Sequence, residues 1–214
     1  MRTQLKKAKT KKTSNIDEKK LFTFMIIYDF AGLKVKGNMS TSLFVQQTLK
    51  DLDKQLKQII KLNFNAEILL CVGLEADLVI NHIQNKYKNF NIRIVENKEF
   101  DSNNSCESLR LLLNNAVNDK IIICDHFASI NKTILSKMNE EKVYAVVSKS
   151  KENCSLIGAN ISKDKRIEYF SFGACQEWRN LFGLFNKCDI NKIKSTLFSR
   201  RYRKKFVFEL MNDI

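Results

Sequence analysis

Asp125 is the residue of this chain whose type and position best suit chemistry. Asp125 directly follows the apolar run Ile-Ile-Ile-Cys. A carboxylate at the carboxyl end of a buried strand lies where open parallel sheets bind their ligands, and Mg²⁺ takes one or two such oxygens together with phosphate. We therefore predict Asp125 as a metal ligand and catalytic residue. An aspartate that caps a helix or closes a turn is equally common at such a position, so that interpretation stays open.

Two clusters carry most of the net charge of +14. Residues 1–20 hold eight basic and two acidic side chains, whereas residues 200–205 hold five basic side chains and no acid. Arginine-rich sequence interleaved with an aromatic residue is typical of contacts to a phosphate backbone. We expect a polyanionic partner, either nucleic acid or an acidic protein surface, although solvated basic segments are the common alternative. The second cluster consists of Arg200, Arg201, Arg203, Lys204 and Lys205.

The other reactive residue types indicate neither a zinc site nor a nucleophile. Six widely separated cysteines without a C-x-x-C pair favour buried free thiols in a reducing compartment. Neither His82 nor His126 has a serine or cysteine partner at a spacing typical of nucleophilic catalysis. The first apolar run begins at Leu21 and is too short for a signal sequence or a membrane span. We expect a cytoplasmic protein without membrane contact.

Apolar runs and helical periodicity predict the elements that must position these residues. Residues 1–18 are polar and aperiodic, so we expect a disordered or extended basic arm before a single domain at residues 19–214. Continuous apolar runs of strand length alternate with amphipathic stretches of helical spacing. This alternation is typical of an α/β protein with a mostly parallel, Rossmann-like sheet and flanking helices. A late β-hairpin and C-terminal helices complete the prediction.

The patterns also predict where these elements begin and end. In the helix predicted at residues 177–185, Trp178, Phe182 and Phe185 would form the core face, with a stacking platform for bases as the alternative. The predicted strands are residues 21–28, 66–72, 92–95, 120–124 and 143–148, with the hairpin at 156–161 and 166–172. The predicted helices are residues 42–62, 75–88, 107–116, 130–139, 177–185, 190–197 and 204–211.

Four stretches in this order resemble the sugar-phosphate nucleotidyltransferases, whose fold is shared with the A-type glycosyltransferases. Residues 26–33, Ile-Ile-Tyr-Asp-Phe-Ala-Gly-Leu, stand where the family has a strand and an Ala-Ala-Gly-x-Gly-x-Arg loop. Residues 71–77 are similar to the strand that ends in V-x-G-Y. Residues 94–109 are similar to the segment N-x-x-[YF]…N…S-L. Residues 121–125 are similar to the strand that ends in the family's metal-binding aspartate.

The resemblance implies a phosphate-binding loop at residues 31–36, and this loop departs from the family pattern. In the family, glycines let backbone N–H groups approach the triphosphate, and an arginine and a lysine neutralise charge. Lys34 stands in place of the second glycine, where a side chain obstructs close approach. Gly32, Lys34 and Lys36 remain the candidates for phosphate contact, with Lys36 as a catalytic candidate. An ordinary loop with exposed lysines is the alternative.

The resemblance also implies contacts to the rest of an NTP. Asn103, Asn104 and Ser108 would face the base or ribose, although helix capping explains the same residues equally well. Asp125 would hold Mg²⁺ in an active protein, together with a second acid from later in the chain. The acids available for that role are Glu168, Glu177 and Asp189.

Two functions compete for this sequence. In the first, the fold is a non-catalytic scaffold with a degraded phosphate loop, and the protein is a structural or binding component that contacts a polyanion through its basic ends. The absence of proline and the abundance of Lys, Asn and Ile indicate an AT-rich genome. Such a genome would suit a viral or phage protein, which could then be located in the virion. In the second, it is a Mg²⁺-dependent enzyme that joins an NTP to a phosphorylated acceptor. The phosphate loop lacks the second glycine and the arginine, and the chain has no clear second acid. These losses remove most electrostatic preorganisation, which favours the non-catalytic function.

Overall fold

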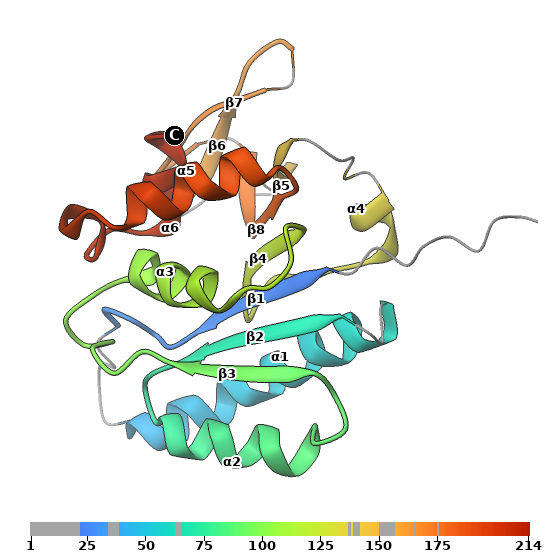
Figure 1. Ribbon diagram of the computed structural model, residues 1–214, viewed down its shortest axis with the longest axis vertical. Coiled ribbons are helices and arrows are strands. Elements are labelled where there is room, and N and C mark those ends of the chain that lie inside the picture. The colour runs from blue at the N-terminus through green and yellow to red at the C-terminus, as the bar shows by residue number, and fades with distance from the viewer. Residues whose placement is uncertain are drawn as a thin grey trace, which may run out of the picture.

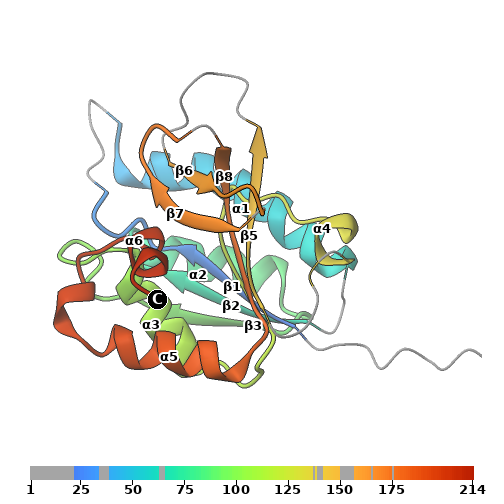
Figure 2. The same cartoon turned by 90° about the horizontal axis from the view of Figure 1, so that it is seen from above.

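The computed structural model describes residues 22–33, 39–62, 66–136, 138, 142–149, 157–164, 166–174 and 176–214. The arm expected at residues 1–18 and the loop lysines Lys34 and Lys36 lie outside them. The described part of the chain forms an eight-stranded sheet with helices on both faces (Figures 1 and 2). This confirms the predicted α/β class.

The first half of the sheet is parallel, as predicted. Because its strands run in one direction, their carboxyl ends meet at one edge of the sheet, where ligands of open α/β sheets bind. β1 pairs with β2 on one side, from Thr23 to Tyr28, and with β4 on the other, from Thr23 to Ile27. In spatial order the parallel strands are β3 (Ile92–Glu96), β2 (Glu67–Val72), β1 (Thr23–Tyr28) and β4 (Ile121–Asp125).

Each face of the sheet has its own hydrophobic core. Phe24, Ile26 and Tyr28 of β1 pack in the core beneath α1 and α2, whereas Met25 packs in the core beneath α3, α5 and α6 (Figure 1). Burial on both faces explains why the β1 sequence is a continuous apolar run instead of an alternating one. The helices are α1 (Thr41–Leu62), α2 (Ala76–Lys86), α3 (Ser105–Asn115), α5 (Lys187–Leu197) and α6 (Val207–Asn212), with a short α4 (Lys132–Ser136).

The second half of the sheet is antiparallel and corrects one prediction. Residues 176–184 form strand β8 (Gln176–Leu184), so the helix predicted at 177–185 is wrong. β8 pairs with β4 through residues 181–184 and with β5 (Val143–Lys149) on its other side. The predicted hairpin is present as β6 (Gly158–Ile161) and β7 (Ile167–Ser171), and β6 pairs with the first residues of β8.

The spacing of the aromatic residues explains why the β8 sequence resembles that of a helix. Trp178 and Phe182 are four residues apart, an even separation that places both on one face of a strand, and both pack in the same core. Phe185 follows three residues later and packs in the opposite core. Between Trp178 and Phe182, the backbone of Asn180 has a φ of 52°, in the left-handed region, and the pairing of β5 with β8 shifts register nearby.

The C-terminal helix predicted at residues 204–211 also begins later than expected. A 3₁₀ turn, η1 (Arg200–Tyr202), precedes it, and α6 starts only at Val207. Phe206 has extended backbone, and its N–H donates to the Glu209 carboxylate over 2.7 Å, which caps the helix at this point. None of the described helices combines the length and the apolarity needed to span a lipid bilayer.

Candidate functional site

A cavity of about 240 Å³ opens at the carboxyl edge of the parallel strands, where β8 diverges from β4. Cys124 and Leu181 form the last pair between these strands, and β8 then pairs with β6 instead. Asp125 and Asn180 are the next residues on the two strands, and both line the cavity. Trp178, Phe182, Phe206, Val207 and Phe208 add an apolar wall. An apolar cavity with few polar groups is typical of ligand sites.

Asp125 closes a turn, as one of the two interpretations of the sequence expected, and it also lines the cavity. Its Oδ1 accepts a hydrogen bond of 2.9 Å from the backbone N–H of Phe127, so it closes the turn after β4. It is also the only acid among the described residues that line the cavity. Burial raises the pKa of Asp125 to about 6, although hydrogen bonds from Phe127, Ala128 and Asn180 act in the opposite direction.

The acids expected to complete a metal site with Asp125 lie elsewhere. Glu177 pairs with Arg179 over 3.1 Å, while Glu168 and Asp189 line a different cavity beside β7 and α5. Among the described residues, no group of three His, Cys, Asp or Glu side chains could hold a metal ion. The described donors therefore offer Mg²⁺ a single carboxylate, and the expected acidic pair is not assembled.

A second buried carboxylate, which the sequence patterns did not reveal, lies under the loop after β1. Asp29 is 1% exposed, and its Oδ2 accepts from Nδ2 of Asn97 over 2.7 Å and from the hydroxyl of Ser108. Its Oδ1 accepts from the backbone N–H of Ala31 over 3.2 Å. Asn103 extends the network through two side-chain hydrogen bonds with Asn97, of 2.9 and 3.0 Å. The one available signal was an acid directly after an apolar strand, as at Asp125.

The residues predicted to face a nucleotide gather in one place but are engaged within the protein. Asn103 and Ser108 are buried in the Asp29 network. Asn104 is the N-cap of α3, because its Oδ1 accepts from the N–H of Ser105 over 2.8 Å. Gly32 has a φ of 73°, and its N–H donates to the carbonyl of Phe100 over 2.9 Å. These contacts hold the loop after β1 against the segment after β3.

The basic cluster at residues 200–205 lies against this same segment. The backbone N–H of Asn104 donates to the carbonyl of Arg203 over 2.8 Å, and that of Cys106 donates to the carbonyl of Lys205 over 3.1 Å. Tyr202, at 1% exposure, anchors the cluster through a hydrogen bond of 2.8 Å to Asp213. The structure therefore places two stretches that are distant in sequence side by side.

The side chains of the basic cluster divide into engaged and available groups. Arg203 lies 3.9 Å from carboxylate oxygens of both Glu99 and Glu107, and Lys205 pairs with Asp213 over 3.0 Å. The guanidinium of Arg201 lies 4.8 Å from the ring centroid of Tyr202 and donates to its hydroxyl. Arg200, Arg201 and Lys204 form no ion pair with any described residue, and of these three Arg201 is engaged by Tyr202. The available cations are therefore Arg200 and Lys204.

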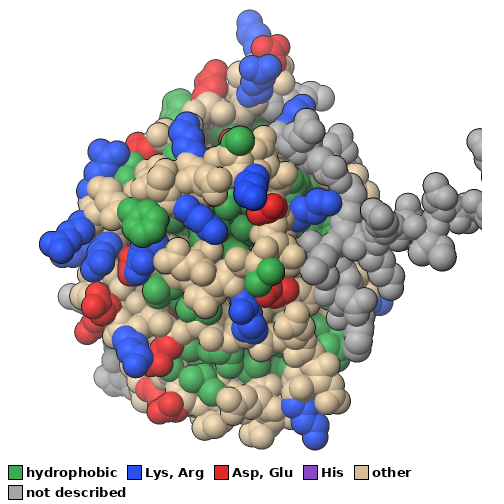
Figure 3. Space-filling model, viewed as in Figure 1, with side chains coloured by type: hydrophobic (Ala, Val, Ile, Leu, Met, Phe, Trp, Pro, Cys, Tyr) green, Lys and Arg blue, Asp and Glu red, His purple; other side chains and the backbone are tan. Residues whose placement is uncertain are grey.

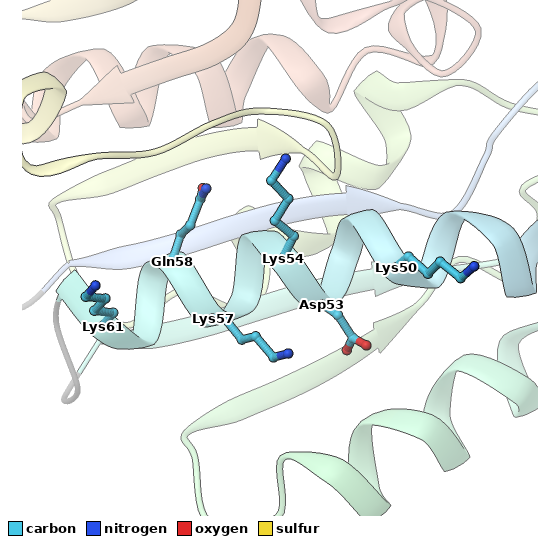
Figure 4. Close-up of a pocket in the computed structure, with 6 residues that line it drawn as sticks. All are labelled: Lys50, Asp53, Lys54, Lys57, Gln58 and Lys61. Atoms are coloured by element: carbon cyan, nitrogen blue, oxygen red, sulfur yellow. The ribbon is translucent and has the colours of Figure 1, made fainter.

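A second basic surface, which the sequence analysis did not anticipate, lies on α1. Four of its lysines recur every three or four residues and line one open pocket (Figure 4). Asp53, the only acid among the described lining residues, pairs with His82 and Lys86 of α2. Although burial acts to raise it, hydrogen bonds from Lys86, His82 and Tyr87 lower the pKa of Asp53. The lysines are Lys50, Lys54, Lys57 and Lys61.

Several solved structures share this fold. The inositol-1-phosphate CTP transferase from T. maritima is similar over 90% of this chain and 80% of its own, with a TM-score of 0.62 and 14% identity. The CTP:phosphocholine cytidylyltransferase LicC from Streptococcus pneumoniae matches over 90% and 85%, with a TM-score of 0.59 and 13% identity. HddC from Yersinia pseudotuberculosis, complexed with GMP-PN, matches over 88% and 84%, with a TM-score of 0.59 and 14% identity.

Sequence comparison alone finds no such relatives: no protein-family model and no curated protein matches the chain. The likeness therefore lies in the structure, and at these identities it shows the fold. The chain has the fold of the nucleotidyltransferases, which confirms the resemblance seen in the four sequence stretches.

Proposed function

We propose that this protein keeps the nucleotidyltransferase fold without the transfer activity, and that it contacts a polyanionic partner through the basic cluster at residues 200–205. The observation that carries the proposal is that the groups expected to bind Mg²⁺ and nucleotide are missing or already hydrogen-bonded within the protein. Asp125 has no second carboxylate beside it among the described residues, and Asn103 and Ser108 are bonded within the protein. Such a site lacks most of the preorganised charge that nucleotidyl transfer requires.

The polyanion contact is supported by how the cluster is held. Tyr202 is buried, and backbone hydrogen bonds fix Arg203 and Lys205 against α3. The cations on this turn are therefore presented from a fixed backbone, so binding costs less conformational entropy than it would from a mobile segment. Arg200 and Lys204 supply charge that no described acid neutralises, and phosphate groups are suitable acceptors for it.

Release of pyrophosphate tests the loss of transfer activity. Each NTP is incubated with Mg²⁺ and a panel of phosphorylated sugars and amino alcohols, and the same assays are run on Asp125→Asn. We expect no pyrophosphate above background from either protein. The alternative function, a Mg²⁺-dependent nucleotidyltransferase, is favoured by one observation, the place of Asp125 in the cavity. Release by the wild type that disappears in Asp125→Asn would establish that alternative.

Heparin binding tests the polyanion contact, because heparin carries dense negative charge and no bases. We compare the wild type with a double variant, Arg200→Gln and Lys204→Gln, over a range of salt concentrations. The matched control neutralises two lysines of α1, Lys54→Gln and Lys57→Gln. We expect the first variant to bind about tenfold more weakly and to lower the salt slope by roughly 1 to 2, as for the loss of two phosphate contacts. An equal loss of binding in the control variant would indicate that the lysines of α1 also contact the polyanion, and would contradict the assignment of the contact to residues 200–205.

A further inference from the structure

Exposed aromatic rings border the basic cluster. Phe172, directly after β7, is 66% exposed, and Phe206, directly before α6, is 43% exposed. Phe206 stacks on Phe208 with ring centroids 5.6 Å apart, and Phe172 meets Phe208 edge-on at 5.6 Å. Both exposed rings therefore pack against the ring of Phe208, which is 5% exposed and holds them as neighbours at the surface. Figure 3 shows Lys and Arg side chains gathered around exposed hydrophobic side chains on the side where the C-terminal elements lie.

Cations and rings alternate along this part of the backbone. Lys204 and Phe206 are two residues apart, and the backbone of Phe206 is extended, with φ −79° and ψ 155°. The acids nearby already have partners, because Glu209 accepts from the N–H of Phe206 and Asp213 pairs with Lys205. An anionic ligand therefore meets available cations beside exposed ring faces, with the neighbouring carboxylates already engaged.

We infer that the surface formed by Phe172, Phe206, Arg200 and Lys204 binds single-stranded nucleic acid, with bases on the rings and phosphates on the cations. The inference rests on the proposed polyanion contact and names the partner. Single strands present base faces that stack on aromatic side chains, whereas the bases of a duplex are already stacked on one another. An acidic protein would neutralise the cations but would leave the exposed rings without a role.

The Asp125 cavity adds a reason to prefer nucleic acid. Phe206 lies at this surface and also lines the cavity, together with the buried ring of Phe208. The cavity is therefore adjacent to a ring on which a base would stack. Asp125 and Asn180 supply an acceptor and an amide there, groups that can hydrogen-bond to the edge of an unpaired base. An anionic lipid surface presents no base edges to these two groups.

Fluorescence anisotropy of the full chain with labelled oligothymidylate tests the inference. Hairpin duplex, heparin and anionic vesicles are the comparison ligands, and thermal melts check that each variant is folded. We expect oligothymidylate to bind more tightly than duplex of equal charge. Phe172→Ala and Phe206→Leu should each weaken oligothymidylate binding about tenfold, the typical loss for one stacked base, and leave heparin binding unchanged. The control Phe127→Ala, at an exposed ring beside α1, should change neither.

The outcomes separate this inference from the function on which it rests. Failure to bind both heparin and oligothymidylate overturns the polyanion contact itself. Heparin binding with no preference for single strands, or oligothymidylate binding that is unchanged in both ring variants, overturns the stacking assignment alone. Vesicle binding that is lost in the same ring variants, without single-strand preference, would assign the surface to a membrane.

Discussion

The side-chain amide of Asn97 donates a hydrogen bond of 2.7 Å to Oδ2 of Asp29, across 68 residues of sequence. Both side chains are 1% exposed. The bond joins the end of β1 to the segment after β3, so residues 31–33, the described start of the loop that should meet phosphate, follow directly on a buried polar network. In such a network, an orphaned partner costs more than one hydrogen bond contributes.

Asn97→Ala should therefore lower the free energy of unfolding by about 2–3 kcal/mol, because it removes one donor from the buried Asp29 carboxylate and leaves the Asn103 amide without its partner. Urea unfolding followed by circular dichroism measures the change. The control is Ser102→Ala, since Ser102 is exposed and the variant loses the exposed bond from its hydroxyl to the carbonyl of Glu99 while the backbone bond between the same residues is kept. A loss below about 0.5 kcal/mol in Asn97→Ala, as expected for the control, would show that the network is not stabilising.

A side chain at Gly73 would clash with its neighbours at the carboxyl end of β2. A Cβ at this position would lie 2.7 Å from the Cβ of Phe100 and 2.9 Å from the carbonyl oxygen of Asp29. Neither neighbour is the free end of a flexible side chain, so Gly73→Ala should destabilise the fold by about 2–3 kcal/mol. Gly173 is the matched comparison, because its φ is 75° and, apart from its neighbours in the chain, no described residue has an atom within 4 Å of its Cβ position.

Gly173→Ala should cost only about 1 kcal/mol, through its backbone conformation alone. The two glycine variants are compared by thermal and urea unfolding under the same conditions. Equal losses at the two positions would mean that the loop of Phe100 yields to the added methyl group, and that the contact with Gly73 is loose.

The parallel half of the fold was predictable because its strands are buried on both faces. Such strands read as continuous apolar runs, and the predicted runs at residues 66–72 and 120–124 lie within one residue of β2 and β4 at each end. β8 was not predictable in the same way. Trp178, Phe182 and Phe185 stand at helical spacing in this part of the chain, and only pairing with distant β4 and β5 makes it a strand.

The sequence indicated where the carboxylates of the candidate site lie, but not which of them line a cavity and which are hydrogen-bonded within the protein. Asp125 and Asp29 both follow apolar strands, and nothing local distinguishes a carboxylate that lines a cavity from one that is bonded internally. The distinction at Asp29 comes from Asn97 and Ser108, which are 68 and 79 residues away. The basic cluster was likewise recognisable, but its contact with the start of α3 through Arg203 and Lys205 arises only from tertiary packing.

We expect the described cysteines to differ in their reactivity toward alkylating reagents according to their burial. Cys188 is exposed, whereas Cys71, Cys106 and Cys124 are buried. Burial raises the pKa of the Cys106 thiol to about 12 and raises that of Cys71 and Cys124 as well, so little thiolate forms at neutral pH. Alkylation with iodoacetamide, mapped by mass spectrometry, should modify Cys188 about 100-fold faster than the other three. Comparable labelling of Cys124 would contradict the packing of β4.

The raised pKa of Asp125 predicts that this residue opposes folding at neutral pH. Between pH 4 and 6 the folded protein holds a proton that the unfolded chain releases, so the free energy of unfolding falls as pH rises through this window. Asp125→Asn should therefore stabilise the protein by about 1–3 kcal/mol at pH 7.5 and by almost nothing at pH 4. The amide oxygen of the variant can still accept from the N–H of Phe127, so the turn is kept.

Urea unfolding at the two pH values measures this difference, with the exposed acid in Asp164→Asn as the control that should change neither value. A variant at Asp125 that is less stable at both pH values would mean that the carboxylate is a structural turn residue. A gain confined to neutral pH would mean instead that the fold maintains a costly buried charge in its cavity, and such a cost is typical of residues kept for a ligand.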